Sequence, residues 1–423
     1  MNKNLITGGV FFVTYGNGHV AKVAPVVTAL RERGIQTFVM ALTLGYKQAQ
    51  ALGLNPLGYQ NFLHLVDKDR AIAYGLELLE RNSHPDVDEN ESVAYLGVNY
   101  LEWVEQYGAI EARQRYESGG RRSFLPVNFI GKVIDQLRPS LIVSTASPRS
   151  EQAAIEAGVA RGIPTLTMMD LFALPSDGFY KNKVFANRIT LLSDLTRKNL
   201  LTRAIDPGRL VVTGCPAYDK LFDPLQATQG AEWKRQLGWE GKYVVMWAGT
   251  LEEASDHTPD EYLGTGLATQ VENLLRDWTI QNENAALIVR YHPSQYHLFD
   301  NLHQHDQVYF SDPRKDPLHT QLHASDCIVT QMSTVGFEGF LIGKRLITLS
   351  FSPMVTTYSS DYSKLGLGES ASSVAHLISI LDMQANFHQN KDALPPQGQA
   401  TPRVVEEMLL LLNAKKPEVE RNL

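Results

Sequence analysis

The fold is decided by residues 10–42, which open with VFFVTYGNGH at 10–19. The apolar run at 10–14 ends in a Gly-Asn-Gly sequence, and a helical pattern follows over 21–33. Such a run, closed by turn residues, is typical of a buried strand. Gly34 is placed to end the helix, and 35–42 is a second apolar run. Strand, glycine loop, helix and strand in this order predict a parallel α/β sheet.

Later apolar runs extend this pattern into two halves. Strands are expected at 140–145, 165–169, 189–193, 210–213, 243–247, 286–290, 308–310, 327–330 and 345–349. The loose Asp/Pro/Gln stretch at 222–230 is expected to be a linker. The pattern predicts an α/β protein of two doubly wound, Rossmann-like domains that face a central cleft. Their expected bounds are 1–222, with a helical insertion at about 62–130, then 231–400, and a C-terminal helix and tail at 401–423.

Composition narrows the class of protein. The chain has 423 residues, 43% of them hydrophobic and 20% charged, which is the balance of a soluble α/β protein. A net charge of −7 gives no basic excess for nucleic acid. No apolar run approaches the roughly 18 residues of a membrane span, and the first residues resemble a strand more than a signal peptide. We therefore expect a cytoplasmic protein, with peripheral contact at the inner face of a membrane left open.

A glycine-histidine loop follows the first expected strand. Gly16 and Gly18 let a ligand approach the backbone, and the next helix offers free N–H groups to an anion. Turn formation alone also explains these glycines. His19 is placed for general-base catalysis, because its ordinary pKa lies near neutrality. A histidine that only hydrogen-bonds the loop is the alternative.

Two strand ends in the second half carry groups suited to phosphate. Gly249 and Thr250 follow one strand, and the sequence Arg-Tyr-His-Pro at 290–293 ends another. Arg290 and His292 can donate to phosphate oxygens, and the proline fixes their turn. A surface arginine near a turn is the simpler interpretation.

The stretch TQMSTVGFE at 330–338 is the most specific pattern in the chain. Ser333 and Thr334 open a helix after a strand, where they either cap it or bind phosphate together with the helix N-terminus. Glu338 lies about one turn further along. This position suits the vicinal hydroxyls of a ribose, and a place on the helix surface is the alternative.

Small polar residues and a carboxylate end two strands of the first half. Ser147 follows one of them and Asp170 the other, so both would face an acceptor. Asp170 is expected to act as a base or to orient His19, and a helix cap is the competing interpretation.

These motifs resemble those of the GT-B glycosyltransferase superfamily, whose members share two facing Rossmann-like domains. The loop at 16–20 resembles the glycine-histidine loop of bacterial enzymes that add N-acetylglucosamine to lipid intermediates. Residues 187–194 and VVTGCP at 211–216 are similar to UDP-N-acetylglucosamine 2-epimerases, which usually have V-T-G-N-P there. The pairing of 290–293 with Ser333-Thr334 resembles bacterial capsule, sialyl and Kdo transferases, whose His-Pro and Ser-Thr motifs hold the donor phosphate.

The departures from the epimerases favour transfer of a sugar. The first loop lacks the epimerase arginine, and TMMDL at 167–171 replaces the H-V-E-A-G segment. A single glutamate, Glu338, stands where the epimerases have two. The nucleotide-binding motifs of the epimerases are therefore kept better in this sequence than their acid/base motifs.

We expect a metal-independent glycosyltransferase without a cofactor. It would move a sugar from a nucleotide-sugar donor, with a UDP-sugar favoured over a CMP-sugar, to a hydroxyl of a glycan or small-molecule acceptor in bacterial-type glycan synthesis. The Asp-x-Asp sequences at 67–69 and 86–88 both fall in the helical insertion, so neither lies in a loop suited to hold a divalent ion at the donor. The expected catalytic residues are His19 and Asp170. The expected donor-binding residues are Gly249, Thr250, Arg290, His292, Ser333, Thr334 and Glu338, and the expected acceptor-side residues are Gly16, Gly18 and Ser147.

Two other functions stay open. One is an epimerase or hydrolase of a UDP-sugar, which needs no acceptor. The other is a non-catalytic nucleotide-sugar-binding module, with the aromatic face of the insertion as its interaction surface. That face comprises Tyr95, Tyr100, Trp103 and Tyr107. Packing of the same residues on their own domain is the alternative.

Overall fold

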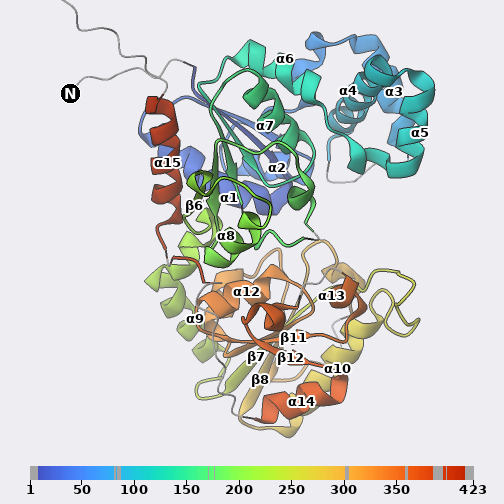
Figure 1. Cartoon of the computed structure of the whole chain (residues 1–423). Coiled ribbons are helices and arrows are strands. Elements are labelled where there is room, and N and C mark those ends of the chain that lie inside the picture. Colours follow the sequence, from blue (N-terminus) through green and yellow to red (C-terminus); the bar gives the residue numbers. More distant parts are fainter. Residues whose placement is uncertain are drawn as a thin grey trace, which may run out of the picture. The chain divides into compact units, whose positions relative to one another are not determined.

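The computed structural model divides the chain into two compact units (Figure 1). The first comprises Met1–Asp219 with Pro395–Leu423, and the second comprises Lys220–Leu394. The structure describes residues 8–80, 82, 87–169, 171–175, 177–300, 304–357, 361–383, 394–396 and 398–414.

A six-stranded parallel sheet forms the centre of the first unit. Its strand order is β2-β1-β3-β4-β5-β6. Alternate residues of β1 enter different cores: Phe11 and Val13 pack on one face of the sheet, and Val10 and Phe12 on the other. A strand buried on both faces must be apolar throughout, which is why this segment is a continuous apolar run. The strands are β1 (Val10–Tyr15), β2 (Thr37–Leu42), β3 (Leu141–Thr145), β4 (Thr165–Met168), β5 (Arg188–Leu191) and β6 (Leu210–Val212).

Helices cover both faces of this sheet. Helix α15 packs on α1, where Val404 and Met408 enter the same core as Val23 and Val27. The C-terminal helix therefore belongs to the first unit (Figure 1). The helices outside the insertion are α1 (Gly16–Glu32), α2 (Leu44–Ala51), α7 (Ser150–Ala160), η3 (Gly178–Lys181), α8 (Asp194–Leu201), η4 (Pro207–Arg209), η5 (Pro216–Phe222, which crosses the boundary) and α15 (Ala400–Ala414).

The expected insertion is helical. It contains η1 (Tyr59–Leu65), α3 (Lys68–Leu79), α4 (Glu89–Tyr107), α5 (Ala109–Gly119), η2 (Gly120–Ser123) and α6 (Val127–Leu137). Tyr95, Tyr100 and Trp103 are buried in the core of the first unit, whereas Tyr107 is 39% exposed. The interpretation of this aromatic face as an interaction surface is therefore wrong for three of its four residues, which pack on their own domain.

Glycines allow α3 and α4 to approach closely. A Cβ atom on Gly97 of α4 would lie 1.8 Å from the carbonyl oxygen of Ala71 in α3. One on Gly75 of α3 would lie 2.1 Å from the carbonyl oxygen of Val93. The backbones themselves are thus in contact, and a larger residue has no space at either position.

The second unit is built on another six-stranded parallel sheet, with the order β12-β11-β10-β7-β8-β9. Its strands are β7 (Tyr243–Gly249), β8 (Ala285–Tyr291), β9 (Val308–Phe310), β10 (Cys327–Thr330), β11 (Arg345–Leu349) and β12 (Glu369–Ala371). Its helices are α9 (Pro224–Gln236), α10 (Gly266–Gln281), η6 (Tyr296–Leu298), α11 (Leu318–Ala324), α12 (Thr334–Leu341), α13 (Pro353–Thr357), η7 (Tyr362–Leu365) and α14 (Val374–Asp382). The two predicted doubly wound, Rossmann-like domains are confirmed.

The expected linker at 222–230 is wrong, because most of it lies in helix α9. Asp223 caps this helix by accepting a hydrogen bond from the amide of Leu225 at 3.0 Å, and Pro224 occupies the first helical turn. Gly230 is a close-packing position, since a Cβ there would lie 2.6 Å from that of His323. These residue types are typical of loops, but here Asp223 and Pro224 start a helix and Gly230 lets it pack closely.

None of the described helices combines the length and the apolar character that a membrane crossing needs.

Replacing Gly97 with Ala is expected to destabilise the first unit. Alanine favours helix, but its methyl group would overlap the Ala71 carbonyl, and such overpacking costs about 1–3 kcal/mol. Denaturant unfolding monitored by circular dichroism measures the change. Gly18→Ala is the matched control, because Gly18 also lies in a helix and has no atom within 4 Å of its Cβ position. Equal stability of Gly97→Ala and the wild type would contradict the backbone contact.

Candidate functional site

A cavity of about 330 Å³ lies at the carboxyl ends of β7, β8 and β10. The strand order changes direction between β7 and β10, and ligands of open α/β sheets bind at such switch points. Six of the seven expected donor-binding residues line this cavity, namely Gly249, Thr250, Arg290, His292, Ser333 and Thr334. Glu338 is not among the lining residues. It lies on α12 beside His319, whose Nε2 is 3.7 Å from Glu338 Oε2.

A buried polar network joins the loops that follow β7 and β10. The amide of Thr250 donates to Gln331 Oε1 at 2.9 Å, and Gln331 Nε2 donates to Glu252 Oε1 at 2.8 Å. Glu252 also accepts from the hydroxyl of Ser352 and, at 3.1 Å, from the amide of Met354. Glu252 and Gln331 are both almost fully buried. Sequence reasoning missed this network, because glutamate and glutamine in a loop usually indicate exposure.

Ser333 caps helix α12. Its hydroxyl accepts from the amide of Val335 at 3.2 Å, and its own amide donates to the hydroxyl of Thr330 at 3.2 Å. The carbonyl of Ser333 accepts from the hydroxyl of Tyr362 at 3.2 Å. The capping interpretation is therefore the observed one. The N-terminus of this helix opens into the cavity, with Thr334 exposed beside it.

Arg290 is held by its own unit and does not present an open fork. Its Nη1 donates to Ser311 Oγ and Gln321 Oε1, both at 2.8 Å, and to the carbonyl of Asp316 at 3.1 Å. Its Nη2 donates to the carbonyl of Pro313 at 3.3 Å. Burial lowers the pKa of Arg290 from its ordinary value, although a guanidinium stays charged in proteins. Arg290 therefore supplies a fixed positive charge in the cavity wall.

His292 is oriented by Ser294. The amide of Ser294 donates to His292 Nδ1 at 3.3 Å, and the Ser294 hydroxyl lies 2.8 Å from the same nitrogen. An Nδ1 that accepts from a backbone N–H places the ring proton on Nε2. Although His292 is exposed as a whole, protein atoms around the ring desolvate it and lower its pKa. At neutral pH the side chain is therefore a neutral donor through Nε2.

In the first unit, His19 lies beside the buried carboxylate of Glu151. Its Nδ1 lies 2.8 Å from the hydroxyl of Thr145 and 3.8 Å from Glu151 Oε1. Glu151 is fully buried, and neither of its carboxylate oxygens has a hydrogen-bond partner in the described part of the chain. Desolvation lowers the pKa of His19, and the negative charge of Glu151 opposes that decrease. This arrangement suits a neutral imidazole that accepts a proton and is then stabilised as a cation.

The residues around His19 differ from the expected loop. Helix α1 starts at Gly16, so Gly16, Gly18 and His19 lie in its first turns and not in a loop before it. Gly16 has a φ of +72°, which favours glycine at this position. Ser147 is buried in the turn after β3. Asp170 lies outside the described residues. Sequence reasoning also missed Glu151, since a glutamate in a helical pattern is usually exposed.

Within the described ranges, no three or more His, Cys, Asp or Glu side chains are grouped so that they could hold a metal ion.

Residues 195–390 match the sequence model of the family described as CDP-glycerol:poly(glycerophosphate) glycerophosphotransferase. The matched segment includes every lining residue of the cavity in the second unit. A search of curated proteins found no match.

Solved structures share the fold of the whole chain. UDP-GlcNAc 2-epimerase from Neisseria meningitidis, bound to UDP-GlcNAc, is 13% identical with a TM-score of 0.58, over 95% of this chain and 99% of that one. The Methanocaldococcus jannaschii UDP-GlcNAc 2-epimerase in complex with UDP-GlcNAc and UDP is 15% identical with a TM-score of 0.55, over 95% and 99%. The wall teichoic acid polymerase TagF is 10% identical with a TM-score of 0.51, over 96% and 90%.

At these identities the structural likeness shows the fold alone, while the family match indicates a transferase. The chain therefore has the GT-B fold of two Rossmann-like domains.

Proposed function

We propose that this chain transfers a group from a nucleotide-activated donor to a hydroxyl of an acceptor, and that the donor binds in the cavity of the second unit. One observation carries the proposal. A helix N-terminus, a neutral histidine donor and a buried arginine charge line a single cavity at a switch point of the sheet. Together they suit a diphosphate, because each stabilises negative charge on phosphate oxygens.

The family match favours CDP-glycerol as the donor over the UDP-sugar that the sequence motifs favour. With CDP-glycerol as the donor, the reaction is a phosphoryl transfer. The acceptor oxygen forms a bond to the phosphorus that carries glycerol, the bond from that phosphorus to the CMP oxygen breaks, and CMP leaves with the electron pair. Sugar transfer from a UDP-sugar is the alternative, in which the acceptor attacks the anomeric carbon and UDP leaves. Both reactions place new negative charge on the departing nucleotide phosphate.

The residues of the second unit would stabilise that leaving group. His292 donates through Nε2, helix α12 presents its N-terminal N–H groups, and Arg290 adds a fixed positive charge. Oriented donors of this kind lower the barrier because they need no rearrangement as charge develops. We propose that they replace a divalent ion and that the reaction needs neither metal nor cofactor.

His19 would act as the base. The carboxylate of Glu151 beside Nδ1 favours the tautomer with its proton on that nitrogen, which leaves Nε2 to take the proton of the acceptor hydroxyl. Glu151 then stabilises the imidazolium that forms. Glu151 is therefore a positioning residue that acts through His19. The roles of Asp170 at the acceptor and of Glu338 at the donor ribose stay predictions from the sequence.

Thermal-shift and calorimetric titrations test the donor class. CDP-glycerol is expected to bind the full chain and raise its unfolding midpoint, because a ligand bound only to the folded state stabilises it by mass action. CMP should bind more weakly. CDP, UDP and UDP-GlcNAc are the comparison ligands. Binding of UDP-GlcNAc together with no effect of CDP-glycerol would contradict the proposed donor.

His292→Ala should weaken CDP-glycerol binding by about tenfold, the equivalent of one lost hydrogen bond of roughly 1–1.5 kcal/mol. His297→Ala is the matched control, because His297 is exposed on η6 and lies outside the cavity lining. Isothermal titration calorimetry gives both dissociation constants. Equal effects of the two substitutions would remove His292 from the donor site.

Glu151→Gln should lower kcat by about 10- to 100-fold, within the range that general-base catalysis contributes. It should also move the acid limb of the rate profile to lower pH. The base works only when His19 is neutral, and loss of the Glu151 charge lowers the pKa of His19 further. The pH dependence of kcat/KM measures this shift, with Glu156→Gln on the same helix as control. A lower rate with an unmoved acid limb would show that Glu151 acts on structure alone.

A further inference from the structure

One buried carboxylate, that of Glu252, joins loops around the cavity of the second unit. The residue is 2% exposed and does not line the cavity itself. Its Oε1 accepts hydrogen bonds from Gln331 Nε2, at 2.8 Å, and from the hydroxyl of Ser352, while its Oε2 accepts from the amide of Met354 at 3.1 Å. Gln331 follows β10, and Ser352 and Met354 follow β11. Glu252 itself follows β7, so its side chain connects three loops at the same edge of the sheet.

The backbone of Glu252 is fixed as well. Its amide donates to the carbonyl of Gly264 at 2.9 Å, and the amide of Gly264 donates to the carbonyl of Glu252 at 3.0 Å. This pair ties together the two ends of the segment 252–264, which lies between β7 and α10. Glu252 is therefore held from two sides, by the backbone pair with Gly264 and by the three groups that donate to its carboxylate.

Thr250, in the cavity lining, belongs to the same network. Its amide donates to Gln331 Oε1 at 2.9 Å, and its hydroxyl donates to Gln295 Oε1 at 2.7 Å. Gln331 is fully buried and lies between Thr250 and Glu252, with its amide group bonded to both. Because Gln295 follows β8, the network reaches the loops after β8, β7, β10 and β11, which are neighbours in the sheet.

These four loops also form the wall of the cavity. Each of them supplies lining residues, among them Thr250, His292, Ser333 and Met354. Loops on the two sides of a switch point diverge, so the sheet alone does not set the distance between them. Hydrogen bonds between their side chains do so here. A cavity that already has its binding shape binds more tightly, because less conformational freedom is lost when the ligand enters.

We propose, on the basis of the transferase function proposed above, that Glu252 is a positioning residue for the nucleotide-activated substrate. It acts on Thr250 through Gln331, and it acts directly on the amide of Met354. A glutamine at this position would place an NH₂ group where only acceptors fit, since Gln331 Nε2, the Ser352 hydroxyl and the Met354 amide all donate.

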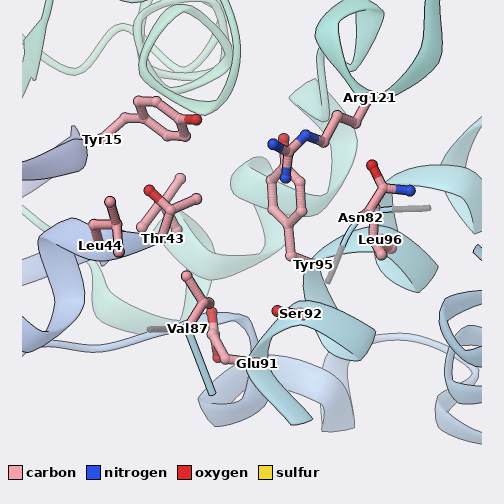
Figure 2. Close-up of a pocket in the computed structure, with 11 residues that line it drawn as sticks. Tyr15, Thr43, Leu44, Asn82, Val87, Glu91, Ser92, Tyr95, Leu96 and Arg121 are labelled. Carbon is pink, nitrogen blue, oxygen red and sulfur yellow. The ribbon is translucent and has the colours of Figure 1, made fainter. Parts of the chain in front are cut away.

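Glu91 offers a matched control in the first unit. It lines a smaller cavity, of about 100 Å³ (Figure 2), and is 7% exposed. Its carboxylate accepts from the amides of Tyr59 at 2.6 Å and Gln60 at 3.1 Å, so it joins η1 to α4 of the insertion. Glu91 and Glu252 are thus buried carboxylates of the same kind that differ in the loops they join.

Isothermal titration calorimetry of the full chain with CDP-glycerol tests this role, with circular dichroism to show that each variant is folded. Glu252→Gln should raise the dissociation constant by about tenfold. Glu91→Gln should leave it within about twofold, because distant sites act independently. In the transferase assay, the KM for CDP-glycerol should rise in Glu252→Gln while kcat stays within about twofold, as expected when ground state and transition state lose the same binding energy.

Exchange of two side chains separates positioning from stability. In the double variant Glu252→Gln/Gln331→Glu, the new glutamate can accept both from the Thr250 amide and from the new glutamine. Most of the lost affinity should therefore return. Ser352→Ala removes a single hydrogen bond to Glu252 and should weaken binding by about threefold, which keeps the role testable if Glu252→Gln does not fold.

Wild-type affinity in Glu252→Gln and Ser352→Ala would overturn the positioning role. Equal losses of affinity in Glu252→Gln and Glu91→Gln would overturn it too, and so would a double variant that binds no better than Glu252→Gln. If the wild type itself does not bind CDP-glycerol, the proposed function fails, and the role of Glu252 fails with it.

Discussion

The change of direction in each parallel sheet is the constraint on which the rest of this structure depends. Right-handed connections send the helices to opposite faces on the two sides of a switch point, so the loops there diverge and leave a space at the carboxyl edge. The first sheet changes direction between β1 and β3, and the second between β7 and β10. His19, Thr145, Thr250 and Ser333 all lie at these two points. Their chemistry follows from where the fold places them.

Buried polar groups hold each site in shape. In the second unit, Glu252 and Gln331 join two loops by hydrogen bonds that water does not compete for. In the first unit, Glu151 has no hydrogen bond among the described residues, and its Oε1 lies 3.8 Å from Nδ1 of His19. A buried carboxylate is costly unless it is paired, and protonation of His19 would pair it. The ion pair between Glu151 and His19 therefore forms when His19 takes up a proton during the reaction.

The sequence alone predicted the regular parts of this fold well, and the failures have physical causes. Apolar runs such as 10–14 and 327–330 are strands because burial on both faces demands them. Strand β12 was missed because its three residues, Glu-Ser-Ala, carry no apolar run. The stretch at 222–230 was predicted as a linker because Asp223 and Pro224 are common to loops and to helix starts.

The site was harder to predict than the fold. Glycine, histidine and hydroxyl residues after strands could be identified from their place in the pattern, and six of the seven expected donor residues line one cavity. Glu151 and Gln331 could not, because the sequence does not show that these two polar side chains are buried; only the packed structure reveals it. The prediction that the Arg290 guanidinium is open to phosphate is wrong for the same reason. Its nitrogens donate to the carbonyls of Pro313 and Asp316, which lie 23 and 26 residues further along the chain.

The proposed function requires transfer from a nucleotide-activated donor, and phosphorus NMR of the reaction follows this transfer. The full chain is incubated with CDP-glycerol and an acceptor that carries glycerol phosphate, in buffer with a metal chelator. We expect CMP and a new phosphodiester to appear together, only when the acceptor is present, and His19→Ala to abolish both. Unchanged CDP-glycerol, together with conversion of UDP-GlcNAc in the absence of any acceptor, would contradict it.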